Sequence, residues 1–154
     1  MAKKIFVAHI HEDDQEVGDL VKLLADHGHW VTDSSVTQDE PNKAKDKDYI
    51  RYQILAPRID ESDELVVLVS PGMRDSEHVE WEIEYANKLG KRIVGVWAQN
   101  GTEDDLPDAL KDYADAVVGW QAERIYEAID GQINNWETSK GELRETQDIN
   151  RHNC

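Results

Sequence analysis

One acidic side chain near the middle of the sequence is placed to do chemistry. At about 100° per residue, Val79, Ile83 and Ala86 form one apolar stripe of a helix. Glu82 lies about 60° from Val79, on the edge of that stripe, while the other acids of this helix point to solvent. We expect Glu82 to face inward, where partial desolvation suits a carboxylate to acid–base or charge-stabilising work. The alternative is a glutamate at the margin of the core whose carboxylate reaches water.

Two His-x-His pairs, His9/His11 and His27/His29, have the spacing of metal ligands. On a strand, residues two apart share a face, so each pair could bind one ion together. The pairs lie at opposite ends of one predicted helix, roughly 20–25 Å apart by its rise, and cannot form a joint site in one chain. We expect no metal: His9 is interpreted as a cleft residue, and His27 and His29 as surface turn residues.

Several other kinds of site are excluded by their missing residues. Asp13 and Asp14 resemble the acid pair of receiver domains, but residues 69–71 and 119–120 hold no acceptor Asp and no Lys. The acid pair is therefore interpreted as a helix cap. The sequence contains no GxGxxG or GxxxxGK[ST] phosphate loop and no GxSxG elbow.

Strands and helices alternate along the chain in the order strand, helix, repeated five times. The strands are short and apolar at nearly every position, as parallel strands covered on both faces require. This order predicts an α/β, flavodoxin-like, three-layer domain with a five-stranded parallel sheet. The predicted strands are 4–10, 29–32, 65–69, 92–98 and 116–120, and the predicted helices are 13–28, 49–59, 76–89, 107–113 and 121–136.

Residues that act on a ligand are expected just after each strand, because open α/β sheets bind ligands beyond the carboxyl ends of their strands. The long polar loop 33–47 falls in such a place, and long loops are often functional. Trp97 and Trp120 end predicted strands and could stack on a base, with core packing as the alternative.

The composition indicates one globular domain. The 154 residues include 17 Lys and Arg against 33 Asp and Glu, a net charge of −16, which repels nucleic acid and anionic membranes. No apolar run of about 18 residues exists to span a membrane, and we expect no signal peptide, because the first residues lack its apolar stretch and cleavage site. The one cysteine, Cys154, allows no internal disulfide, so we expect a cytoplasmic protein.

Three blocks of sequence resemble the TIR (Toll/interleukin-1 receptor) domain family. They are Lys4-Ile-Phe-Val-Ala-His-Ile-His, Asp60-Glu-Ser-Asp-Glu-Leu-Val-Val-Leu-Val-Ser-Pro, and Ser76-Glu-His-Val-Glu-Trp-Glu-Ile-Glu-Tyr-Ala followed by Gly90-Lys-Arg-Ile-Val-Gly-Val. Their order and spacing resemble the bacterial subgroup of stand-alone antiphage proteins, such as the TIR component of Thoeris systems. The resemblance covers about residues 3–133.

The resemblance implies an enzyme that cleaves NAD+ at the nicotinamide–ribose bond. NAD+ would be the substrate and no cofactor would be needed; the products would be nicotinamide and ADP-ribose, a cyclic isomer or another ADP-ribosyl signal. The family's catalytic glutamate falls on Glu82. The substrate-binding positions fall on Ala8, where the family usually has Ser, on His78, where it often has Trp, and on His9, Asp33, Ser34 and Ser70.

The same resemblance implies partners and a domain boundary. TIR–TIR contacts would let the chain self-associate, with the loop 33–47 closing over NAD+ or contacting a neighbour. A separate effector protein would respond to the nucleotide product. The TIR-like domain is expected over residues 1–136, with a frayed or disordered polar tail over 137–154. Two other functions stay open: a non-catalytic TIR scaffold, and a hydrolase like nucleoside deoxyribosyltransferases.

Overall fold

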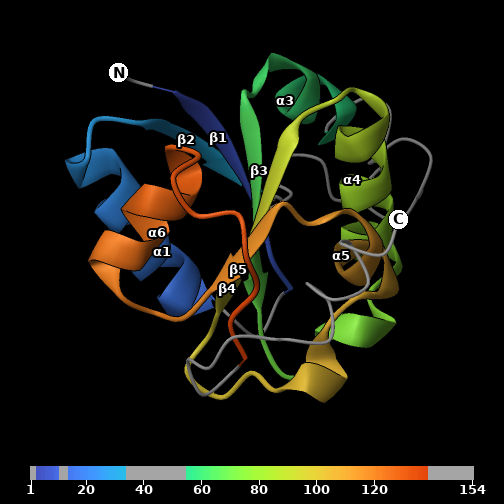
Figure 1. Ribbon diagram of the computed structural model, residues 1–154. Coiled ribbons are helices and arrows are strands. Elements are labelled where there is room, and N and C mark those ends of the chain that lie inside the picture. Colours follow the sequence, from blue (N-terminus) through green and yellow to red (C-terminus); the bar gives the residue numbers. More distant parts are fainter. Residues whose placement is uncertain (1–2, 11–13, 34–54, 139–154) are drawn as a thin grey trace.

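The computed structural model describes residues 3–10, 14–33 and 55–138 of the chain. Within them, one sheet has the strand order β2-β1-β3-β4-β5, and every adjacent pair is parallel. The strands are β1 (Lys4–Ala8), β2 (Trp30–Asp33), β3 (Glu64–Val69), β4 (Arg92–Trp97) and β5 (Ala116–Val118). Figure 1 shows this sheet between two layers of helices, which confirms the predicted flavodoxin-like α/β fold.

Helices α1 and α6 cover one face of the sheet, and α3, α4 and α5 cover the other (Figure 1). Their bounds are α1 (Asp14–Asp26), α3 (Ala56–Glu61), α4 (Glu77–Lys88), α5 (Asp108–Tyr113) and α6 (Ala122–Ile129), and two 3-10 turns are η3 (Met73–Asp75) and η4 (Glu103–Asp105). Of the helix predicted over 49–59, residues 49–54 lie outside the described part. Pro57 lies in the first turn of α3, where a missing N–H is tolerated. None of the helices in the described ranges is long and apolar enough to cross a bilayer.

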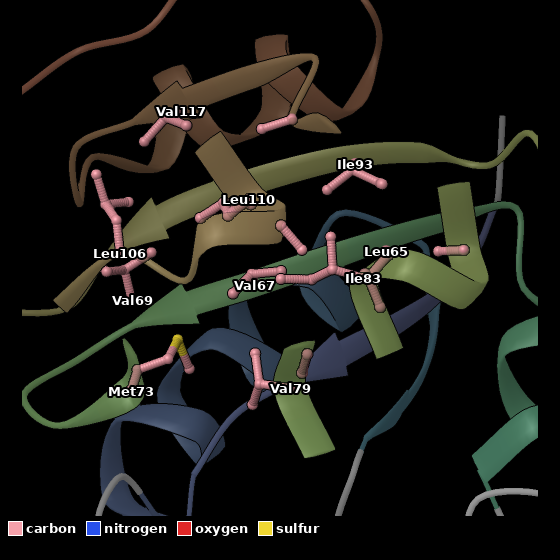
Figure 2. Close-up of a cluster of buried hydrophobic side chains, with 14 of the residues drawn as sticks. Leu65, Val67, Val69, Met73, Val79, Ile83, Ile93, Leu106, Leu110 and Val117 are labelled. Atoms are coloured by element: carbon pink, nitrogen blue, oxygen red, sulfur yellow. The ribbon is translucent and has the colours of Figure 1, made fainter. Parts of the chain in front are cut away.

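Side chains along each strand alternate between two apolar cores. Phe6 and Val67 belong to the core under α3, α4 and α5, whereas Val7 and Val66 belong to the core under α1 and α6. This alternation explains why the strands are apolar at almost every position. Figure 2 shows the first of these cores, where side chains from α4 and α5 close on β3; its labelled members are Leu65, Val67, Val69, Met73, Val79, Ile83, Ile93, Leu106, Leu110 and Val117.

Three helices end at a glycine with positive φ, which L side chains rarely adopt. Gly28 follows α1 with a φ of 93°, Gly90 follows α4 with 74°, and Gly131 follows α6 with 84°. The Gly131 N–H donates to the Ala128 carbonyl at 3.2 Å, which closes the last turn of α6. The predicted helix over 121–136 is therefore wrong in length, because the glycine ends it several residues early.

After α6 the chain runs back along the outer side of β5. Trp136 forms a parallel bridge with Val117, and the Glu137 N–H donates to the Val117 carbonyl at 2.7 Å. Trp136 and Glu137 are 2% and 6% exposed, so packing continues one residue past the predicted domain end. The rest of the predicted tail, from residue 139 onwards, lies outside the described residues.

Candidate active site

Glu82 lies on α4, whose two ends are set by local sequence. Ser76 Oγ accepts a hydrogen bond from the Val79 N–H at 3.2 Å and caps the helix start, and Gly90 follows the helix end. Glu82 is 0% exposed, so its predicted inward orientation is confirmed and its burial is complete. The buried face of α4 consists of Val79, Glu82, Ile83 and Ala86.

The flank of α4 that carries Glu82 faces away from α5. Glu80, predicted to point to solvent, is instead half-buried: its Oε1 accepts a hydrogen bond from the Ala109 N–H at 2.9 Å, which marks the flank that contacts α5. Glu82 is about 160° round the helix from Glu80. His78, one turn earlier and half-buried, is its neighbour on the same flank. The two side chains with the strongest implied roles on α4 therefore share one surface of the helix.

The strand ends bring most of the predicted substrate-binding residues to one edge of the sheet. The order of strands reverses between β1 and β3, and doubly wound sheets bind ligands at such a switch point. Ala8 ends β1 and is followed by the half-buried His9, and the fully buried Ser70 follows β3. Asp33 ends β2, next to β1. Ser34 lies outside the described residues.

Asp105 ties the turn after β3 to the turn after β4. Its Oδ1 accepts the Gly72 N–H at 3.0 Å, and its Oδ2 accepts the Thr102 N–H at 2.9 Å. Burial alone would raise the pKa of Asp105, but these hydrogen bonds lower it below its ordinary value. Asp105 lies in the segment after β4 where ligand-binding residues are expected, and Thr102 and Asp105 have the spacing of a capping box.

The turn after β4 also approaches the end of β3 at close range. A Cβ added to Gly101 would lie 2.3 Å from the Val69 carbonyl oxygen, so only glycine fits there. The Ala98 N–H donates to the same oxygen at 2.9 Å. Ser70, the next residue along the chain, is consequently held between two fixed turns.

The histidine pairs differ from their prediction in one respect. His27 is exposed, as expected, but His29 is only 7% exposed, so its interpretation as a surface residue is wrong. The cause is local: the turn after α1 directs His29 inward, where Nδ1 accepts the Lys3 N–H at 3.1 Å. Asp130, remote in sequence, completes a cluster with both rings. His11 lies outside the described residues.

The aromatic side chains divide between packing and the flank near Glu82. Trp97 is 2% exposed and its Nε1 donates to the Glu137 carbonyl at 2.9 Å, so the packing interpretation holds for this residue. Trp120 is half-buried against the core under α1 and α6. On α4, Trp81 and Tyr85 stack with ring centroids 5.0 Å apart.

Together, the parallel sheet, its helical layers and its strand order define the chain as a flavodoxin-like α/β domain, with polar residues gathered at its carboxyl edge. Residues 6–103 match the family described as "Thoeris protein ThsB, TIR-like domain". The match spans more than half of the 154 residues, and the chain belongs to this family. The resemblance stated from the sequence is thus confirmed. Among curated proteins, none is a significant match.

Solved structures share the fold at low sequence identity. The CMP N-glycosidase BcmB of Clostridium botulinum has a TM-score of 0.52 and 18% identity, over 83% of this chain and 99% of that chain. A conserved protein from Enterococcus faecalis has a TM-score of 0.58 and 17% identity, over 86% of this chain and 100% of that one. At such identities these likenesses show the fold alone.

Proposed function

We propose that this chain cleaves the bond between nicotinamide and ribose in NAD+, with Glu82 as the catalytic residue. The observation that carries the proposal is the complete burial of this carboxylate on α4, in a chain of the Thoeris TIR-like family. A fully buried glutamate is uncommon because its charge loses the stabilisation of water, and such residues concentrate at functional sites.

The proposed chemistry needs one well-placed negative charge. As the C1′–N bond breaks, its electron pair passes to the nicotinamide ring, which leaves as neutral nicotinamide, and the ribose gains oxocarbenium character. A carboxylate shielded from water stabilises this developing positive charge more strongly than one in solvent, and it can also accept a ribose hydroxyl. Water adding at C1′ and losing a proton gives ADP-ribose, whereas a nucleophile within the substrate gives a cyclic isomer.

Other residues at the carboxyl edge are proposed to bind the substrate. Ala8 leaves room at the end of β1, and His9 and Ser70 flank the switch point with donors and acceptors. His78 shares the flank of Glu82 and would contact the nicotinamide side of NAD+. Asp33 and Ser34 are proposed to contact the substrate from the end of β2, as the family resemblance implies.

The proposed biological role is antiphage signalling in the cytoplasm. The ADP-ribose-derived product would act on a separate effector protein, and self-association through TIR–TIR contacts would complete or regulate the site. NAD+ is consumed in this scheme as substrate, with no cofactor. The strongly negative charge of −16 gives the chain no general attraction for nucleic acid or anionic membranes.

A second candidate is cleavage of the N-glycosidic bond of a nucleotide such as CMP. The observation in its favour is the shared fold with the CMP N-glycosidase of Clostridium botulinum. The bond broken is of the same type, so Glu82 would have the same task at C1′. The two candidates differ only in the leaving group, which makes them separable by substrate.

Mass spectrometry of incubations with NAD+ or CMP tests the proposal. We expect nicotinamide from NAD+ and no cytosine from CMP. Glu82→Gln should lower nicotinamide formation by about 100-fold or more, as loss of a transition-state contact does. Glu84→Gln is the matched control, because Glu84 is exposed on the same helix; it should retain activity within about twofold.

Each other outcome has a defined meaning. Cytosine without nicotinamide would establish the second candidate. Undiminished nicotinamide formation by Glu82→Gln would reject Glu82 as the catalytic residue. If the concentrated, self-associated chain converts neither substrate, the TIR scaffold becomes the better description.

A further inference from the structure

Two histidines and one aspartate meet at the amino edge of the sheet, on the opposite side from the candidate active site. One ligand atom from each of His27, His29 and Asp130 lies within 4.8 Å of the other two. His27 Nε2 is 4.0 Å from Asp130 Oδ2. Imidazole nitrogens and a carboxylate oxygen are the ligands that zinc and similar ions prefer.

The fold brings these residues together by placing two helix ends side by side. His27 directly follows the last residue of α1, and Asp130 directly follows the last residue of α6. The Tyr126 hydroxyl donates to the Leu23 carbonyl at 3.2 Å and joins the two helices. The His27 ring also stacks on Tyr126 with centroids 3.8 Å apart and planes at 8°, which restricts its orientation.

His29 carries the second observation that points to a ligand. The residue is 7% exposed, and its Nε2 is buried without a hydrogen-bond partner among the described residues. Buried polar atoms of this kind are rare and call for an explanation. Burial and the neighbouring His27 lower the pKa of His29.

The electrostatic field around the cluster favours a cation. The carboxyl ends of α1 and α6 carry the partial negative charge of the helix dipole, and both ends adjoin the cluster. The positive charge of Lys3, which also acts on His29, is paired with the Glu64 carboxylate at 2.6 Å from its Nζ.

We propose that His27, His29 and Asp130 bind a divalent transition-metal ion, for which Zn²⁺ is the probe. Zinc bonds of about 2.0–2.1 Å require ligand atoms roughly 3.3 Å apart, so the cluster must contract on binding. His27 and Asp130 can make this movement, because their side chains are 39% and 38% exposed. The ion would join the ends of α1 and α6 and leave coordination positions to water, which is a stabilising role rather than a catalytic one.

Binding through His29 requires a change of tautomer. Nδ1 accepts the Lys3 N–H, so the ring proton of the metal-free protein lies on Nε2. When Nε2 binds the ion, that proton must move to Nδ1, and the hydrogen bond from Lys3 is lost. A single neutral hydrogen bond contributes far less than three metal–ligand bonds, so the exchange favours the metal. The Lys3 amide is therefore a reporter of the proposed site.

Calorimetric titration of the metal-stripped full chain with Zn²⁺ tests the proposal. Cys154 and His152 are themselves potential zinc ligands, so all variants carry Cys154→Ser and His152→Gln. We expect one Zn²⁺ per chain with a Kd in the micromolar range. His27→Gln and Asp130→Asn should each weaken binding by about tenfold or more, while Asp19→Asn, an exposed change on α1, should not.

Two further readouts keep the result decisive. Zn²⁺ should raise the Tm of the parent chain more than those of His27→Gln and Asp130→Asn. In an NMR titration, the Lys3 amide resonance should shift with the same stoichiometry. Absence of stoichiometric binding, or equal affinity in His27→Gln, Asp130→Asn and the parent, would overturn the proposal, and neither result would bear on NAD+ cleavage.

Discussion

Two buried glutamates, one at the amino edge of the sheet and one on α4, have different surroundings. At the amino edge, Glu64 is 3% exposed, with Lys3 Nζ at 2.6 Å and Arg92 Nε at 3.9 Å. Glu82 is 0% exposed in the middle of α4, on a buried face whose other members are Val79, Ile83 and Ala86. Burial alone therefore does not identify a catalytic acid; for Glu82 the membership of the chain in the Thoeris TIR-like family adds to it.

The amino edge uses its charges to hold the chain together. Lys3 Nζ also donates to the Ile129 carbonyl at 2.7 Å, and Arg92 Nε donates to the Ala128 carbonyl at 3.0 Å. Glu64 thus pairs with two cations, and both cations also donate hydrogen bonds to carbonyl groups at the end of α6. The carboxyl edge instead gathers small and polar residues after its strands. We infer that the first edge serves stability and the second serves chemistry.

The largest expected loss of stability follows removal of a cation from the amino edge. Lys3→Met should cost about 3 kcal/mol, because it leaves the buried Glu64 carboxylate with only the more distant Arg92. Urea denaturation measures the loss. Lys22→Met, an exposed change on α1, is the control and should stay within about 0.5 kcal/mol of the parent. Equal stability of the two variants would contradict the division between the edges.

A smaller effect is expected at the turn after β4. Gly101→Ala should cost about 2 kcal/mol, because the new methyl group would lie 2.3 Å from the Val69 carbonyl oxygen. Gly18→Ala is the matched control: no atom lies within 4 Å of its added Cβ, and this helical position should gain up to about 1 kcal/mol. Thermal unfolding of both variants checks the pair. A harmless Gly101→Ala would mean that the turns at the carboxyl edge adjust freely.

The smallest effect concerns pH. Burial raises the pKa of Glu64 above its ordinary value of 4.5, and its partners Lys3 and Arg92 reverse only part of the shift. The folded state then binds the Glu64 proton more tightly than the unfolded state. Its contribution to stability is fully present below pH 4.5 and is lost as pH rises through the raised pKa.

Glu64→Gln removes this titration. The stability of the parent relative to Glu64→Gln should therefore fall as pH rises from about 4 towards 7. Urea midpoints at several pH values measure the difference, with the exposed Glu84→Gln as a variant whose difference should remain flat. If the relative stability increases with pH instead, the pKa of Glu64 is set mainly by its salt bridges and not by its burial.

The elements with continuous apolar patterns could be predicted from sequence. The strands and α4 follow from local periodicity and end signals, and the inward position of Glu82 follows from helix geometry alone. The end of α6 was missed, because the prediction gave the apolar residues Ile133 and Trp136 more weight than Gly131. Both side chains are buried, but they belong to the segment that follows α6 and not to the helix; Trp136 pairs with β5.

Contacts between remote segments could not be predicted. Nothing local to Asp130 indicates that it meets His27 and His29, since the two helix ends come together only in the folded sheet. The same holds for the hydrogen bond between Asp105 and Gly72. The local sequence pattern therefore identified single candidate residues, whereas the clusters formed by remote segments depend on how the strands and helices are connected.

The most direct test of the division between the edges measures stability and NAD+ turnover together for Glu82→Gln and Lys3→Met. For Glu82→Gln we expect turnover per folded molecule to fall by about 100-fold or more, because the transition state loses its carboxylate. Its stability should stay within about 1.5 kcal/mol of the parent, because the amide has nearly the same volume. Lys3→Met should show the reverse: lower stability with unchanged turnover per folded molecule. Full turnover by a folded Glu82→Gln chain would contradict the account.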